Sequence, residues 1–196
     1  ACNQLQFAIS LRRAMAKLIM WNLVTLDGFF EGPGHDISWH HDAWSEDLET
    51  LSLEQGHSAS GLLFGRVTYE LMADYWPKES GPIADFMNAL PKHVFSRTQT
   101  QSGWNNTRML SGDAPQIVER LKRESAKDIY LFGIADLASG LVDRGLIDEY
   151  RIGIAPILLG SGTPLFKQGS QKTGLSLLET RPVARGVVIL RYAPAR

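Results

Sequence analysis

Residues 61–76, GLLFGRVTYELMADYW, combine a buried strand, a glycine turn and a helix start with groups that can bind an anion. The apolar run 62–64 predicts a strand covered on both faces, and Gly65 lets the chain turn tightly into a helix. Arg66 and Thr68 stand in the first turn of that helix. A cation there opposes the helix dipole by about 0.3–1 kcal/mol, which favours an anion held between Arg66 and the free amides. The structural alternative is an exposed arginine that extends into water.

A second candidate anion site follows the strand predicted at 91–95. Ser96 and Arg97 stand at the end of that strand, where an acidic residue would be needed to accept a ribose hydroxyl. A hydroxyl and a cation at this position favour the 2′-phosphate of NADPH over the bare ribose of NADH. Ser-Arg-Thr is also ordinary loop chemistry, so a purely structural turn is the alternative.

Glycines supply two further candidate cofactor contacts. Gly133 closes the strand predicted at 128–132, and a helix is predicted from Ile134 and Ala135 onward with Asp136 as its N-cap. Gly160 and Gly162 also offer backbone amides, although they lack the third glycine of a dinucleotide fingerprint. Because parallel strands end at one edge of a sheet, the junctions at Gly65, Ser96 and Gly133 could converge on one dinucleotide.

Candidate proton donors lie around the helix predicted at 44–55. Asp42 and Asp47 are both eligible, and we favour Asp47 because it stands one turn before Leu51, where partial burial would make it a more effective acid. A histidine and a solvated surface carboxylate are the alternatives. The histidines at 35, 40 and 41 predict no metal site, because adjacent side chains do not share a helix face and no second ligand cluster completes a set.

Composition indicates one domain and excludes several partner classes. The 196 residues carry 20 Lys plus Arg against 21 Asp plus Glu, so the net charge of −1 provides no field for nucleic acid or an anionic membrane. No apolar run is long enough for a membrane helix. The single Cys2 fits a reducing cytoplasm. Residues 1–14 are interpreted as an extension ahead of Met15, with a native N-terminal helix as the alternative.

The predicted elements define an α/β fold with a mostly parallel sheet. Helices separate most of the early strands, and two antiparallel strands follow at the end. The helix after Gly65 is predicted to face inward through Val67, Leu71 and Tyr75. Residues 29–34 are predicted to be an irregular loop and a potential lid. The predicted strands are 17–26, 61–64, 91–95, 107–110, 128–132, 146–155, 175–181 and 186–192.

Three motifs resemble the dihydrofolate reductase superfamily, namely GRVTYE, TLDGFFEG and the run PILLGSGTPLF at 156–166. The last is most similar to the branch that contains the riboflavin-biosynthesis reductase domain and its stand-alone relatives, and the likeness extends over 16–192. The resemblance implies a single three-layer dihydrofolate reductase-like domain over 15–196. No zinc deaminase motif accompanies it.

The resemblance also implies roles for individual residues. Arg66 and Thr68 would hold NADPH phosphates, and the backbone of 133–135 would approach the pyrophosphate. Asp27 and Phe30 would border nicotinamide and substrate, and Trp39 matches a tryptophan that precedes the substrate-facing helix. Ile134 replaces a glycine common in the superfamily, so we expect Ile134→Gly to tighten NADPH binding if that side chain crowds the pyrophosphate.

These features predict an NADPH-dependent reductase of a small C=N or C=O substrate that is pterin-like or pyrimidinone-like. The cofactor would supply hydride, and an acid or water would supply the proton. A non-catalytic nucleotide-binding or sensing protein on the same fold is the alternative. The resemblance further implies a homodimer.

Overall fold

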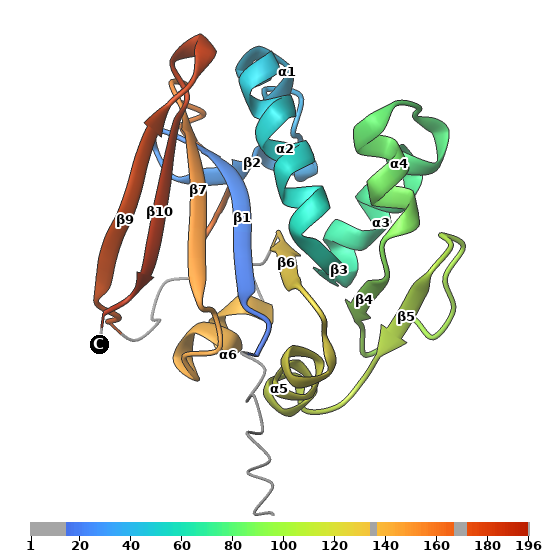
Figure 1. Cartoon of the computed structure of the whole chain (residues 1–196). Helices are drawn as coiled ribbons and strands as arrows, with labels where there is room; N and C mark the ends of the chain where they lie inside the picture. The colour runs from blue at the N-terminus through green and yellow to red at the C-terminus, as the bar shows by residue number, and fades with distance from the viewer. Residues whose placement is uncertain (1–14, 134–136, 167–171, 196) are drawn as a thin grey trace, which may run out of the picture.

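A computed structural model describes residues 15–133, 137–166 and 172–195 (Figure 1). The predicted helix start at Ile134, Ala135 and Asp136 therefore lies outside the described residues, as does segment 1–14. The strands are β1 (Leu18–Thr25), β2 (Phe29–Glu31), β3 (Ala59–Gly65), β4 (Lys92–Phe95), β5 (Thr107–Leu110), β6 (Asp128–Phe132), β7 (Glu149–Ala155), β8 (Thr163–Pro164), β9 (Leu175–Pro182) and β10 (Val188–Pro194). The α-helices are α1 (His40–Ala43), α2 (Glu46–Ser58), α3 (Arg66–Tyr75), α4 (Pro82–Ala89), α5 (Ala114–Glu124) and α6 (Leu137–Asp143).

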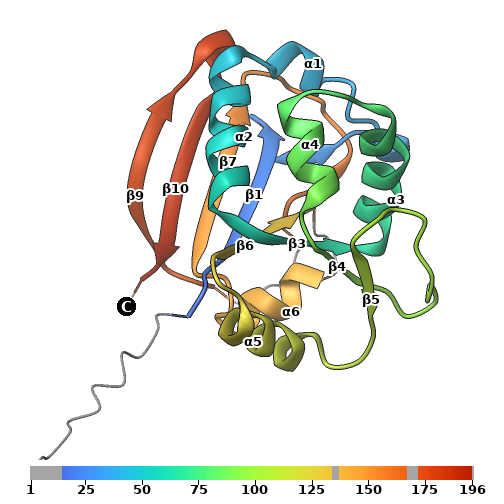
Figure 2. The ribbon, with the colours of Figure 1, turned by 45° about the vertical axis from the view of Figure 1, so that its right-hand side comes forward.

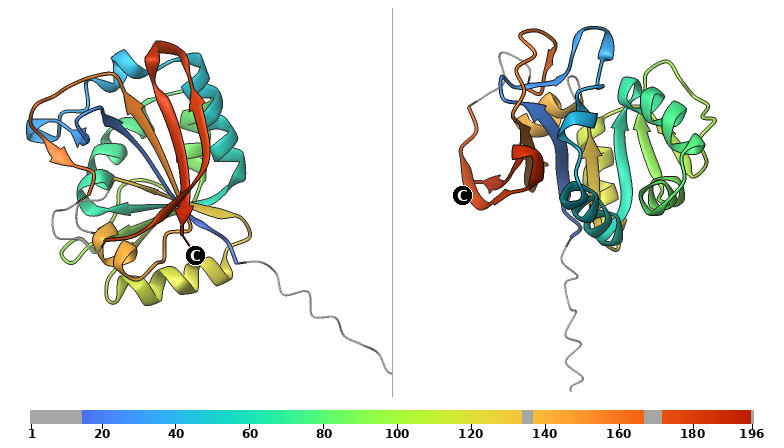
Figure 3. Two further views of the ribbon diagram at one scale, coloured as in Figure 1. Left: turned by 90° about the vertical axis from the view of Figure 1, so that its left-hand side faces the viewer. Right: turned by 90° about the horizontal axis from the view of Figure 1, so that it is seen from above.

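The main sheet has the order β5-β4-β3-β6-β1-β7-β10-β9. Strands from β5 to β7 pair in parallel, whereas β10 pairs antiparallel with both β7 and β9. Figure 3 shows the β9–β10 hairpin at this end of the sheet. The predicted fold class, a mostly parallel sheet with an antiparallel C-terminal edge, is confirmed.

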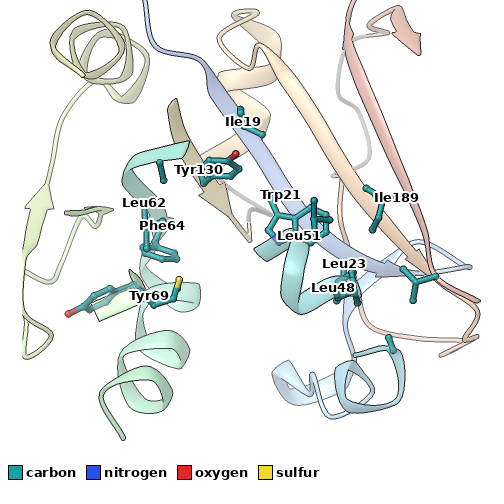
Figure 4. Close-up of a cluster of buried hydrophobic side chains, with 14 of the residues drawn as sticks. Ile19, Trp21, Leu23, Leu48, Leu51, Leu62, Phe64, Tyr69, Tyr130 and Ile189 are labelled. Carbon is teal, nitrogen blue, oxygen red and sulfur yellow. The ribbon is translucent and has the colours of Figure 1, made fainter. Parts of the chain in front are cut away.

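Helices cover both faces of the sheet and make a three-layer domain (Figure 2). Alternate residues of β1 serve the two faces because side chains of a strand alternate in direction. Ile19, Trp21 and Leu23 pack with the cluster that includes Leu48 and Leu51 of α2, as Figure 4 shows. The intervening residues of β1 pack with the cluster under α5 and α6. The mostly apolar composition of this strand thus follows from burial on both sides.

The inward face predicted for α3 is wrong. Val67 and Leu71 are each 37% exposed and Tyr75 is 49% exposed, whereas Tyr69 is only 2% exposed and belongs to the core. Met72 packs against the same cluster. A short helix with apolar residues on two sides does not reveal which side contacts the sheet, and here the second side lines cavities described below.

Three predicted boundaries also differ. Residues 29–34 are not wholly irregular, because β2 pairs with β8, a contact between segments distant in sequence. The helix predicted from Trp44 begins at Glu46, since the Ser45 side chain accepts a hydrogen bond from Leu48 N at 3.4 Å and caps it. The strand predicted from residue 146 begins at Glu149. Trp44 is thereby left outside the helix.

Candidate active site

A cavity of about 730 Å³ lies along the carboxyl ends of the parallel strands. We call it the polar cleft. Its walls include the residues that follow β3, β4 and β6, because parallel strands end at one edge of the sheet. Six residues predicted as cofactor contacts line it, namely Gly65, Arg66, Thr68, Ser96, Arg97 and Gly133. The three junctions thus converge on one cleft.

The polar cleft presents cations, a hydroxyl and a helix N-terminus. Gly65, the N-cap of α3, makes no side-chain cap, so the first amides of this helix are not covered by a capping group. Arg66 Nη1 donates to both carboxylate oxygens of Glu70 at 3.0 and 2.9 Å, in a pair about half exposed on each side. Such exposed pairs contribute little, and Arg66 can exchange this partner for an anion at small cost. Arg97 has no carboxylate partner among the residues described.

Ser96 is held in place by the turn that follows β4. Its Oγ accepts hydrogen bonds from Thr98 N at 3.2 Å and Gln99 N at 2.8 Å. Ser96 is 9% exposed, and its own hydroxyl proton remains available for donation. The loop chemistry weighed as an alternative is therefore present, and it places the hydroxyl in the wall of the cleft.

Gly133 is required by two independent constraints. Its φ of +57° lies in the left-handed region, and a Cβ on this residue would overlap the side chain of Thr68. Its amide donates to Asn22 Oδ1 at 2.9 Å. The glycine therefore lets β6, α3 and β1 approach one another at the floor of the cleft. Predicted contacts at Ile134 and Ala135 lie outside the described residues.

The second cavity, about 180 Å³, lies between the sheet and helices α2, α3 and α4. We call it the aromatic cavity, because its walls include Trp21, Phe30, Trp44, Trp76, Phe86 and Tyr130. Gly56 of α2 shapes one wall, since a Cβ there would overlap the Phe86 ring of α4. Leu71 lines the same cavity and Val67 lines the polar cleft. This explains why two of the three side chains predicted to face the core are partly exposed.

Three polar residues that line the aromatic cavity have buried side-chain atoms with no hydrogen-bond partner in the described part of the chain. These atoms are Asn22 Nδ2, His40 Nε2 and both amide atoms of Gln55. Asn22 Oδ1 accepts from Gly133, which fixes Nδ2 as the free donor. Burial, aided by the nearby His41, lowers the pKa of His40 to about 4, so its imidazole is neutral at pH 7. Unpartnered buried polar atoms are rare and call for a functional explanation.

The two cavities share part of their walls. Phe30, Glu31, Thr68 and Gly133 line both. Glu31 is 3% exposed, and its Oε1 accepts hydrogen bonds from His35 Nδ1 and from Thr163 Oγ1, each at 2.7 Å. The His35 side chain is 51% exposed. A buried carboxylate at the junction is therefore linked through an imidazole to solvent.

Asp27, predicted to contact substrate, organises a loop instead. Its carboxylate accepts from Thr25 Oγ1 at 2.6 Å, Gly160 N at 2.8 Å and Leu159 N at 3.3 Å. The bond from Thr25, then that from Gly160, lowers the pKa of Asp27. It lines neither cavity. The carboxylate is engaged in pinning the loop after β7 to the turn after β1.

Gly160 and Gly162 likewise line neither cavity. The Gly160 amide is committed to Asp27, and a Cβ on Gly162 would overlap the backbone carbonyl oxygen of Glu31. Gly162 has a φ of +150° and allows β8 to lie against β2. Both glycines therefore have a packing role in this structure, and neither borders the two cavities.

The predicted proton donors Asp47 and Asp42 lie elsewhere. Asp47 is exposed, and its Oδ2 accepts from Ala184 N at 2.8 Å in the β9–β10 turn. Asp42 is exposed, and its backbone oxygen accepts from Arg185 at 3.2 Å. Neither lines a cavity, because the start of α2 lies against that turn. The stripe of α2 that faces the aromatic cavity is made by Ser52, Gln55 and Gly56 instead.

Trp39 is a core residue. It is 5% exposed, and its ring packs edge-on against His40 with centroids 4.3 Å apart. His40 and Trp44, its neighbours in sequence, line the aromatic cavity, as does Phe30. Among the residues described, no group of histidine, cysteine and carboxylate side chains could hold a metal ion. No described helix is long and apolar enough to cross a membrane.

Comparison with known proteins identifies the class to which this architecture belongs. The chain matches the RibD C-terminal domain over residues 16–189 and belongs to that family. It is a reductase-like domain with the dihydrofolate reductase-like fold that the motifs indicated. The recognition made from those motifs is confirmed.

Individual relatives agree with this assignment. The uncharacterized protein YyaP of Bacillus subtilis (strain 168) is 32% identical over 181 residues, which cover 90% of this chain and 94% of YyaP. A provisionally named riboflavin biosynthesis protein from Shewanella sp. PV-4 superposes with a TM-score of 0.76 at 21% identity and covers 93% of this chain and 100% of its own. A pyrimidine reductase-like protein from Corynebacterium diphtheriae gives a TM-score of 0.68 at 14% identity, with 92% of both chains covered. The two structural likenesses show the fold.

Proposed function

We propose that this protein is an NADPH-dependent reductase of a small C=N or C=O compound. The observation that carries the proposal is the shared wall of two unlike cavities. The polar cleft has cations and uncapped helix amides for phosphates, and the aromatic cavity has apolar walls for a ring. A hydride donor in one and an acceptor in the other would meet at Phe30, Glu31, Thr68 and Gly133.

The polar cleft fits NADPH by its donor set. Arg97 and Arg66 supply two cations, Ser96 and Thr68 supply hydroxyls, and the α3 N-terminus supplies amides. Among the described residues that line the polar cleft, one is acidic. This residue, Glu31, lies at the junction with the aromatic cavity. We assign the phosphates to the arginine side of the cleft and the nicotinamide to the junction. When bound there, the cofactor would supply the hydride.

Glu31 replaces Asp47 as the proposed proton source. After hydride addition to the carbon of a C=N or C=O bond, the nitrogen or oxygen must gain one proton. Glu31 in its acid form would transfer that proton from its carboxyl group, and His35 would return one to Glu31 from solvent. His35 has a φ of +63°, a conformation unusual for a residue other than glycine, and its ring contacts Glu31 Oε1. Imidazole suits this relay because one ring nitrogen can accept a proton while the other donates one.

A turnover assay tests the function. Purified protein is mixed with NADPH and with pterins, pyrimidinones and quinones, and cofactor oxidation is followed by absorbance. We expect oxidation with at least one acceptor class and a lower rate with NADH. Tight NADPH binding without oxidation of any acceptor would instead favour the nucleotide-sensing alternative.

The role of Glu31 is tested separately by Glu31→Gln, which keeps an oxygen for Thr163 but cannot carry the proton. With an active acceptor, we expect turnover to fall about 100- to 10,000-fold with NADPH affinity retained. Asp47→Asn is the control and should leave turnover unchanged. Full activity of Glu31→Gln would remove the relay from the account.

Three further expectations belong to the proposal: residues 15–196 form one functional domain, the protein is cytoplasmic, and it forms a homodimer. Light scattering of the purified chain measures the last of these directly. A monomer at working concentration would contradict it without affecting the assignment of the two cavities.

A further inference from the structure

We infer that the substrate is an uncharged, non-phosphorylated planar ring compound with a lactam edge, and that Gln55 recognises this edge. The inference rests on the proposed function, because it treats the aromatic cavity as the substrate site. It goes further by naming the chemistry that the cavity accepts and rejects. The charge, the size and the unpartnered polar atoms of that cavity support the inference.

Charge is the first criterion. Among its described lining residues the aromatic cavity has no lysine or arginine, and its one carboxylate is Glu31. His40 also lines it and is neutral at pH 7, since burial lowers its pKa to about 4. A phosphate or carboxylate placed here would lose its water without gaining a cation from the described lining residues. The cavity therefore selects neutral molecules.

Size and shape give the second criterion. The volume of about 180 Å³ is below the roughly 300–1,000 Å³ usual for ligand pockets, so a ring of one or two cycles fits better than a ring with a sugar phosphate. The walls include Trp21, Trp44 and Trp76. Flat aromatic walls favour a flat aromatic guest.

Hydrogen bonding gives the third criterion. Gln55 is 6% exposed, and neither Nε2 nor Oε1 has a partner among the described residues. One amide offers a donor beside an acceptor, which a lactam edge matches with an acceptor beside a donor. Asn22, a lining residue from β1, has a second donor, Nδ2, with no partner among the described residues. Such groups are costly when empty, and a lactam guest would satisfy them.

Binding without cofactor tests the inference independently of turnover. Quinazolinedione, a neutral fused ring with lactam edges, is titrated into the full chain while tryptophan fluorescence is followed, since three tryptophans line the cavity. We expect saturable quenching by quinazolinedione. Orotate and uridine monophosphate, which carry a carboxylate and a phosphate on a related ring, should fail to displace it. Displacement by either anion at equal or lower concentration would overturn the inference.

Gln55→Leu separates recognition from structure. Removal of an unpartnered buried amide should leave the Tm unchanged or higher, while quinazolinedione affinity falls about tenfold for each hydrogen bond lost. Gln116→Leu makes the same change on the exposed side of α5 and should alter neither value. A lower Tm with undiminished quinazolinedione binding would show that Gln55 is structural and would overturn its assigned role.

The two proposals can fail separately. Saturable quinazolinedione binding with no NADPH oxidation by any acceptor would refute the reductase while leaving the ligand class intact. NADPH oxidation by a phosphorylated pyrimidine, with no binding of neutral rings, would support the reductase and overturn the ligand class.

Discussion

The polar cleft and the aromatic cavity are built against the same sheet but bind by opposite physical means. The polar cleft gathers two arginines, hydroxyls and helix amides at strand ends. The aromatic cavity has neutral side chains over most of its surface and keeps even its histidine uncharged. Where they meet, one buried carboxylate is linked to solvent. The difference shows how one fold can hold a polyanionic cofactor beside a neutral substrate without mixing their electrostatics.

The origin of the walls explains the difference. Residues that follow β3, β4 and β6, including the first turn of α3, line the polar cleft, where backbone amides and polar side chains are accessible. Side chains from within β1, β6 and α2 to α4 line the aromatic cavity, where burial disfavours charge. The contrast predicts different responses of the two cavities to mutation, pH and salt.

Removal of both arginines should remove the positive charge of the polar cleft and leave the aromatic cavity unchanged. Charge-assisted hydrogen bonds contribute about 1.5–3 kcal/mol each, so Arg66→Ala with Arg97→Ala should weaken NADPH binding at least 100-fold. The preference over NADH should shrink at the same time. Calorimetric titration measures both affinities, with Arg123→Ala on the exposed face of α5 as the matched control. Equal NADPH affinity in the double variant would place the phosphates elsewhere.

Acid should destabilise the protein through the aromatic cavity. The pKa of His40 falls from 6.5 to about 4 on folding, mainly through burial, so the unfolded chain binds more protons between these values. The free energy of unfolding should therefore fall as pH drops from 6.5 toward 4, and the His40 contribution reaches about 3 kcal/mol below pH 4. Urea unfolding across this range should show a shallower loss for His40→Gln, whereas the exposed His41→Gln should follow the parent. Identical profiles for all three proteins would contradict the neutral buried imidazole.

Gly133→Ala should damage the wall that the cavities share. The left-handed φ and the overlap with Thr68 should together cost about 1–3 kcal/mol of stability. Gly145→Ala is the control, because Gly145 has a similar φ of +63° but open space around its Cβ position. We expect the larger loss at Gly133, with weaker binding in both cavities. Equal losses would mean that the contact with Thr68 adds nothing.

Ionic strength should change ligand affinity in the polar cleft but not in the aromatic cavity, and this is the smallest of the expected effects. Raised ionic strength screens exposed charges, so NADPH affinity should fall severalfold between low and high salt while quinazolinedione affinity stays constant. Fluorescence titrations at matched salt concentrations measure both. Parallel salt dependence of the two ligands would indicate that they share a charged site.

The polar cleft could be predicted from the sequence because the ends of buried strands are recognisable as apolar runs followed by a glycine or a polar residue. Gly65, Ser96 and Gly133 each follow an apolar run, and a parallel sheet must bring such positions to one edge. The fold followed from the same periodicity. The helix phase did not follow, since Leu51 and Gln55 are both buried on α2, yet Leu51 packs in the core cluster while Gln55 lines the cavity. Which buried residue of α2 faces the core and which faces the cavity depends on how neighbouring helices pack. The choice of Asp47 rests on its position one turn before Leu51, and Leu51 faces the core.

Two missed residues left a usable signal. Asn22 interrupts the apolar strand 18–25. Burial of an amide in such a strand costs free energy unless the amide forms hydrogen bonds, so its presence there is a signal. Gln55 and Ser52 form a polar pair at helical spacing in a helix that must bury one face. The sequence gives no comparable signal for Glu31. Its burial depends on the pairing of β2 with β8, which the sequence does not reveal.

A ternary crystal structure with NADP⁺ and quinazolinedione tests the central claim most directly. The account predicts cofactor phosphates at Arg66 and Arg97, the nicotinamide beside Phe30 and Glu31, and the quinazolinedione against Gln55 in contact with the nicotinamide ring. Cofactor phosphates away from both arginines, or the two ligands in one cavity, would contradict the division of this molecule into a cleft for the cofactor and a cavity for the substrate.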